Sequence, residues 1–157
     1  MKLLFGAPLG LLFSLSTFGE DLPCYRAMDP VTALLPRTIC VAVSGLQEDE
    51  NHRLFAILSY SLDGGPLVTR LEALEYLKFE LHYTVARLPI LDLEEEFPGQ
   101  KCEDYERHFL GVQILLTPDN RLYNGNLIID ARSYLIRDIC ENDQVTGRRT
   151  EYRSINS

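Results

Sequence analysis

Three histidines are the first candidates for chemistry in this chain, because histidine is the side chain that ordinarily gains or loses a proton near neutral pH. They are His52, His82 and His108. His52 falls in a polar loop, His82 lies on the polar side of an alternating segment, and His108 begins an apolar run. Their spacing matches no catalytic pattern, and no Gly-x-Ser-x-Gly nucleophile motif is present. We therefore expect no catalytic residue and no enzyme activity.

Carboxylates gather in one acidic run, Asp92 with Glu94-Glu95-Glu96. Their oxygens are ligands of the kind that Ca²⁺ takes. A run of like charges is more often a solvated loop, and we interpret this one in that way. The chain also lacks Cys-x-x-Cys and paired histidines, the usual ligand spacings of zinc. The sequence predicts no metal site and no cofactor.

The four cysteines are Cys24, Cys40, Cys102 and Cys140. An even count in a secreted chain is typical of a disulfide framework, and four cysteines allow three pairings. We expect Cys24 to pair with Cys140, which closes nearly the whole domain into one loop, and by elimination Cys40 to pair with Cys102. A crosslink over a loop of that length stabilises by about 4 kcal/mol in the chain-entropy model.

The first nineteen residues have the pattern of a secretory signal peptide. Lys2 precedes an apolar run, and small or polar residues lead to Gly19, after which we expect cleavage. The run is shorter than the roughly 20 residues that span a bilayer, so no membrane association is predicted. The chain has a formal charge of −8, and removing Lys2 makes it −9 (−8 minus 1). Because nucleic acid is bound largely by cations, RNA is an unfavourable partner.

The mature part is predicted to be one domain, residues 20 to 140, followed by a polar, disordered tail at 141 to 157. Asp29-Pro30 is a typical helix start, and a short helix is expected at residues 31 to 35. Residues 38 to 43 fit either a continuation of that helix, kinked at Pro36, or a strand. A second short helix is possible at residues 71 to 77. Strands are expected at 54 to 60, 76 to 83, 85 to 91, 109 to 116, 122 to 129 and 134 to 139, with a polar loop at 92 to 105.

Part of the chain resembles the C-terminal half of small secreted fungal ribonucleases, a scaffold shared by the ribonuclease-like secreted effectors of powdery mildew fungi. The similar segments are Leu88-Pro89-Ile90-Leu91, Phe97-Pro98-Gly99, Gly111-Val112-Gln113-Ile114-Leu115, Asp119-Asn120, Leu127-Ile128-Ile129 and Ile139-Cys140. The resemblance implies an α+β fold, with one short N-terminal helix packed on an antiparallel β-sheet and braced by disulfides.

The resemblance also implies that the ribonuclease site has been lost. The family's Glu, Arg and His fall near Arg87 or Leu88, near Gly111, and near Ile129 or Asp130. None of these is the required residue, and Arg107, close to the second position, does not replace the missing acid and base.

We therefore predict a secreted, monomeric, non-catalytic effector that binds a host protein, with delivery into host cells as an open possibility. Tyr83, Tyr105, Tyr123 and Tyr134 are possible interface anchors. The alternative is an extracellular inhibitor or ligand carrier, such as a cystatin-like protein. Against cystatins, Gln113 is followed by Ile-Leu-Leu-Thr and not by their Gln-x-Val-x-Gly hairpin.

Overall fold

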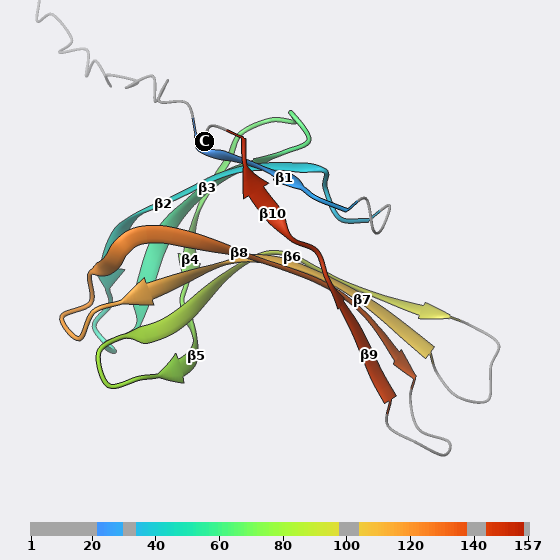
Figure 1. Ribbon diagram of the computed structural model, residues 1–157. Helices are drawn as coiled ribbons and strands as arrows, with labels where there is room; N and C mark the ends of the chain where they lie inside the picture. The colour runs from blue at the N-terminus through green and yellow to red at the C-terminus, as the bar shows by residue number, and fades with distance from the viewer. Residues whose placement is uncertain (1–21, 30–33, 98–103, 138–143, 156–157) are drawn as a thin grey trace, which may run out of the picture.

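The computed structural model describes residues 22–29, 34–97, 104–137 and 144–155, and its elements are all antiparallel strands (Figure 1). The first five are β1 (Cys24–Ala27), β2 (Thr38–Glu48), β3 (Leu54–Leu62), β4 (Val68–Ala73) and β5 (Glu75–Phe79). The others are β6 (Thr84–Phe97), β7 (Asp104–Leu116), β8 (Leu122–Arg137), β9 (Gln144–Arg149) and β10 (Tyr152–Ser154). The expected α+β fold is therefore wrong, because the described part of the chain contains no helix.

The strands form two five-stranded sheets in which neighbours follow one another along the chain, except that β10 pairs with β1. One sheet has the order β10-β1-β2-β3-β4, and the other has the order β5-β6-β7-β8-β9. The chain changes sheet between β4 and β5 at Leu74, whose N–H donates to Leu54 O at 3.0 Å. It returns between β9 and β10 at Thr150, whose N–H donates to Ala131 O at 3.1 Å. Both crossing residues are buried, and each remains hydrogen-bonded to the sheet that it leaves or enters.

The core lies between the facing sides of the two sheets. Because side chains alternate along a strand, every second residue of β2, β3, β6 and β7 points inward. The fully buried ones include Ile39, Val41, Leu58, Leu88, Leu110, Val112 and Ile114. Arg70 of β4 joins the two sheets, because its Nη2 donates to Pro89 O of β6 at 2.5 Å.

The strands β6, β7 and β8 are longer than predicted. Phe97 lies opposite Asp104, and Asp104 opposite Arg137, so the sheet continues through most of the segment predicted as a polar loop. Figure 1 shows these ends, with β9, extending beyond the part of the molecule where the sheets face each other. The register with β7 is unbroken from Leu91 to Phe97, so main-chain pairing continues along this segment.

Both predicted helices differ from the structure. Residues 30–33 lie outside the described part, and Leu34 and Leu35 after them form a turn and a bend. A second short helix was considered possible at residues 71 to 77. They instead form the end of β4, the crossing residue Leu74 and the start of β5. The ambiguous residues 38 to 43 belong to strand β2.

The disulfide pairing also differs from the expectation. Cys24 is bonded to Cys40, not to Cys140, because β1 and β2 are neighbours and place the two cysteines directly opposite each other. The expected Cys40–Cys102 pair is excluded by the same bond. Cys102 and Cys140 lie outside the described residues.

The C-terminal segment contains ordered elements. Strands β9 and β10 lie within residues 141 to 157, where we expected a disordered tail, and β10 pairs with β1. The predicted signal peptide lies outside the described residues. Among the residues that the structure describes, no helix is long and apolar enough to cross a membrane.

Candidate binding surfaces

The outer side of the second sheet carries a row of paired charged side chains and one amide, which we call the charged face: Glu75, Arg87, Asp92, Arg107, Gln113, Asp130 and Arg132. A β-bulge between Pro89 and Leu91 brings them together. Arg87 and Asp92 are five residues apart and would otherwise point to opposite sides of β6. The extra residue at the bulge reverses the alternation, so Asp92 lies opposite Phe109 on the outer side.

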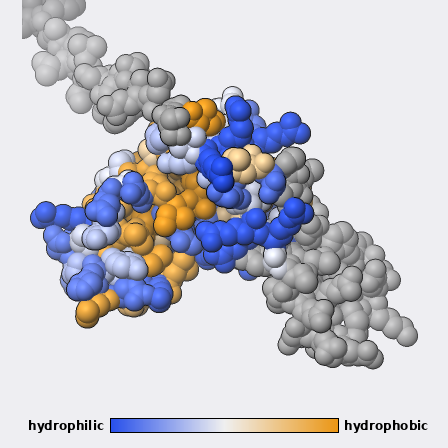
Figure 2. All heavy atoms as spheres, viewed as in Figure 1, coloured by the Kyte–Doolittle hydropathy of each residue, from blue (hydrophilic) through white to orange (hydrophobic). Residues whose placement is uncertain are grey.

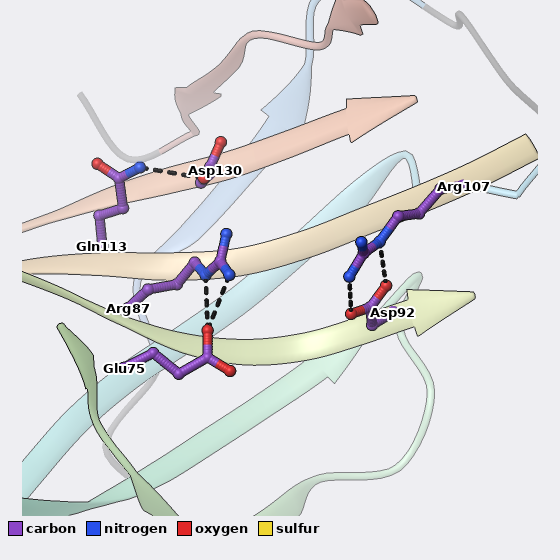
Figure 3. A network of polar contacts seen from close by, with 6 residues as sticks. All are labelled: Glu75, Arg87, Asp92, Arg107, Gln113 and Asp130. Atoms are coloured by element: carbon purple, nitrogen blue, oxygen red, sulfur yellow. Dashed lines mark hydrogen bonds and ion pairs between the residues drawn. The ribbon is translucent and has the colours of Figure 1, made fainter. Parts of the chain in front are cut away.

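Two arginine–carboxylate pairs cross the strands of this face (Figure 3). Arg107 Nε and Nη2 donate to the two oxygens of Asp92 at 2.9 and 2.7 Å. Arg87 Nε and Nη2 both donate to Glu75 Oε2, at 3.0 and 2.8 Å. The hydrogen bonds from Arg107 hold the pKa of Asp92 below its usual value, against the effect of burial, and the charges of Arg107 and Arg87 assist. Asp92 therefore stays ionised and is a poor proton acceptor near neutral pH.

Asp130 is the most enclosed carboxylate of the charged face, with no exposed surface. It accepts hydrogen bonds from Arg132 Nε at 2.7 Å and from Gln113 Nε2 at 3.0 Å. A buried carboxylate needs such partners, because removing an ion from water costs several kcal/mol. These bonds fix Asp130 within the sheet and occupy oxygens that a substrate would otherwise contact.

An aromatic side chain lies beneath the charges. The Phe109 ring is only 4% exposed although it is on the outer side of β7. The Arg87 guanidinium carbon lies 4.3 Å from the ring centroid, a cation–π distance. Gly111 leaves room for the other part of the ring, because a Cβ there would lie 2.7 Å from Phe109 Cζ. Phe109 thus supports Arg87 from below.

The positions that the ribonuclease resemblance implied do meet on this face. Arg87 and Arg107 are in the ion pairs above, and Gly111 lies directly opposite Asp130. Their charges are engaged with one another, and no histidine is among them. The charged face thus has the composition of a binding surface more than of an acid–base site.

The three histidines lie on separate elements. His52 is in the turn after β2, with Nδ1 2.5 Å from Glu48 Oε1, and His82 is in the turn between β5 and β6. His108, on β7, is buried, with Nδ1 3.1 Å from Ser133 Oγ. Of the four candidate tyrosines, Tyr83 and Tyr123 contact each other with ring centroids 6.1 Å apart. The side chains of Tyr105, Tyr134 and Glu94-Glu95-Glu96 lie outside the described part.

A groove opens where the two sheets meet on the β8 side, and we call it the seam groove. It has a volume of about 530 Å³ and is lined by Tyr25, Leu127, Ile128, Ile129, Arg149, Thr150, Glu151 and Tyr152. It forms because the chain leaves β8 at Thr150 and joins β1, where the Met28 N–H donates to Glu151 O. In Figure 2, apolar side chains are visible between the two sheets and are bordered by hydrophilic ones. No sequence pattern indicates this groove, because its residues come from three distant segments.

Tyr152 provides a pH-dependent contact in the wall of the seam groove. Its hydroxyl donates to Pro36 O at 2.5 Å, and burial, followed by the negative charge of Asp63, raises its pKa to about 12. The folded protein therefore favours the neutral phenol more strongly than the unfolded chain does, in which the pKa of tyrosine is about 10. This contribution to stability is complete below pH 10 and is lost as the pH rises from about 10 to about 12. We expect the urea midpoint to fall over this range, and to fall less in Tyr152→Phe.

The exposed Tyr123 provides the control for this measurement, because Tyr123→Phe is expected to keep the alkaline decline of the unaltered protein. An equal decline in Tyr152→Phe and Tyr123→Phe would contradict the assignment to Tyr152.

A third surface, which we call the apolar edge, follows β4 and β5. Thirteen large hydrophobic residues are exposed in the described part of the chain, and seven of them lie between residues 67 and 81. They are Leu67, Val68, Leu71, Tyr76, Leu77, Phe79 and Leu81, and the last two are 74% and 87% exposed. β4 and β5 are each the last strand of a sheet, so each has one side without a neighbouring strand among the described residues.

No family model, no curated protein and no solved structure matches this chain. The class of protein follows from the structure itself: the described residues form a small, all-β domain of two antiparallel sheets.

Proposed function

We propose that this protein is an exported, non-catalytic binding protein that recognises a host protein through the apolar edge. The observation that carries the proposal is the concentration of exposed hydrophobic side chains on, or next to, two strands that end their sheets. Monomeric soluble proteins rarely expose large contiguous apolar areas unless these bind a partner. Open sheet edges also offer main-chain groups for pairing with another chain.

The charged face supports a binding function over an enzymatic one. Its carboxylates are engaged by arginine or amide donors, which leaves little capacity for proton transfer. Net negative charge makes RNA an unfavourable partner. The expected ribonuclease-like fold is not part of this proposal, which depends only on the surface of the all-β domain.

A ligand carrier is the alternative function. Carriers of this general architecture enclose their ligand between the sheets, whereas here Leu58, Leu88, Leu110 and Ile114 fill that space. The seam groove is partly open to solvent and lies beside the core. Protein binding therefore remains the function that we propose.

We expect the double variant Phe79→Ser/Leu81→Ser to bind the host partner at least tenfold more weakly. Each large side chain contributes about 1.5–3 kcal/mol when fully buried, so the loss of two exceeds the 1.4 kcal/mol of a tenfold change. Proteins of a host-cell extract would be photo-crosslinked to the unaltered protein and to the variant, and quantified by mass spectrometry. The affinity of each recovered protein would then be measured by calorimetry with purified components.

Leu93→Ser/Ile155→Ser is the matched control, because both residues are exposed hydrophobics away from β4 and β5. It should retain the partner, and both double variants should unfold within about 0.5 kcal/mol of the unaltered protein, as surface substitutions do. Equal binding by Phe79→Ser/Leu81→Ser and the control would contradict the apolar edge as the binding surface.

A further inference from the structure

The seam groove exposes a stretch of strand β8 that has no neighbouring strand on one side. β9 pairs with β8 only from Arg132 to Arg137, and the chain then crosses to the other sheet. β7 pairs with the opposite side of β8 at Leu122 and then from Leu127 to Arg137. Within the described residues, Leu127 to Ile129 therefore form an open sheet edge at the wall of the groove.

The main-chain groups of this edge point into the groove. Ala131 O accepts the hydrogen bond of the Thr150 N–H, so the polar groups of Ala131 face the side of β9. Along a strand these directions alternate, and the register with β7 is unbroken from Ala131 to Leu127. The N–H and C=O groups of Ile129 and Leu127 therefore face the same side as those of Ala131. They are placed to pair with an extended chain.

The groove presents apolar side chains toward the core and a charged side chain toward the outer side, as an added strand with alternating residues requires. Leu127 and Ile129 pack against the core, as does Tyr25 across the groove, so one side of an inserted strand would meet apolar groups. The outer side would meet Arg149, which lies opposite Arg132 of the charged face. The volume of about 530 Å³ is within the range of about 300–1,000 Å³ found for ligand sites.

Arg149 gives the groove a charge preference. It is exposed and has no ion-pair partner among the described residues, whereas Glu151 is paired with Arg153 at 3.0 Å. The cation that remains at the rim is complementary to a carboxylate. In a chain of net charge −8, this is a local exception that favours an acidic ligand.

We propose that the seam groove binds an extended peptide segment of another protein as an additional strand beside β8. The segment has apolar residues at alternate positions facing the core, and an acidic residue on the other side next to Arg149. This site is separate from the apolar edge, so it does not depend on the function proposed above.

The probe for this site is a fluorescein-labelled, C-terminally amidated hexapeptide, Ser-Val-Thr-Val-Asp-Val. Its valines share one side of a strand and its aspartate lies on the other. We expect saturable binding in fluorescence anisotropy, weakened about fivefold when lysine replaces the aspartate, the scale of an exposed ion pair. N-methylation of the amides that face β8 should weaken binding at least tenfold, and N-methylation of the alternate amides should weaken it much less.

Arg149→Ala should remove the preference for aspartate over lysine. Arg148→Ala is the matched control, because Arg148 is also exposed but points to the opposite side of β9, and it should keep the preference. In hydrogen-exchange NMR, the peptide should slow exchange of the Leu127 and Ile129 amides, whereas that of Ile128, which faces β7, should change little.

Three results would overturn the proposal. One is equal affinity for all of these peptides. Another is peptide-induced protection that leaves the Leu127 and Ile129 amides unchanged. The third is concentration-dependent protection of these amides without peptide, together with a dimer in sedimentation, which would assign the edge to a second copy of the chain.

Discussion

Gly111→Ala is expected to destabilise the protein by about 1–3 kcal/mol, the usual cost of overpacking a filled interior. A Cβ at this position would lie 2.7 Å from Phe109 Cζ and 3.0 Å from the main-chain oxygen of Leu88. The Leu88 oxygen belongs to the neighbouring strand and cannot move without disturbing the sheet. Urea unfolding at neutral pH measures the loss.

The direction of this effect is informative because alanine is intrinsically better than glycine in a strand, by roughly 0.5–1 kcal/mol. A neutral or stabilising result would therefore show that the close packing at Gly111 is absent. Phe109→Leu/Gly111→Ala provides the internal control. Removing the ring relieves one of the two clashes, so the combined loss should be smaller than the sum of the two single losses.

The parts of the fold that could be predicted are those in which local pattern and final environment agree. The apolar residues 54 to 60 lie within β3, and Val112, Ile114 and Leu116 share the buried side of β7 as their alternation indicates. The turn at Asp63-Gly64 is also where turn chemistry places it, with φ angles of 49° and 71°.

The parts that could not be predicted depend on contacts between distant segments. Leu71, Leu74 and Leu77 have helical spacing, yet Leu74 is buried because the chain changes sheet there. The polar segment at 144 to 149 becomes β9 because β8 provides a partner strand. β1 is only four residues long and is ordered between β2 and β10. Sequence periodicity alone contains none of these relations.

The binding surfaces could not be predicted from the sequence for the same physical reason. Arg87 and Asp92 share the charged face only because a bulge reverses the alternation of β6. Phe79 and Leu81 fall within the strand predicted at residues 76 to 83, but β5 ends at Phe79 and both side chains are exposed. The strand predicted at residues 76 to 83 is only partly correct, because Leu81 and His82 form a bend before β6 and all five residues of β5 are exposed. Whether the apolar residues of this segment would be buried depended on the position of the other sheet, which sequence periodicity does not contain.

Cys24→Ser/Cys40→Ser is expected to lower the free energy of unfolding by about 3 kcal/mol, the chain-entropy estimate for a loop of about this length. The bond joins residues separated by 16 positions and links β1 to β2. β1 also pairs with β10, so loss of the disulfide should loosen the wall of the seam groove that these two strands form. Urea unfolding of the oxidised protein and of the double variant measures the difference.

Peptide mapping without reduction tests the same bond independently of stability. It should recover Cys24 linked to Cys40, and Cys140→Ser should leave that crosslinked peptide intact. If Cys24 instead requires Cys140, the crosslinked peptide of Cys24 will disappear in Cys140→Ser, and the pairing of β1 with β2 will no longer explain the bond. The two pairings make opposite predictions for Cys140→Ser, because this variant removes the partner of Cys24 in a Cys24–Cys140 bond but leaves both sulfurs of the Cys24–Cys40 bond in place. A Cys24–Cys140 bond would enclose nearly the whole domain, whereas the Cys24–Cys40 bond joins only β1 to β2.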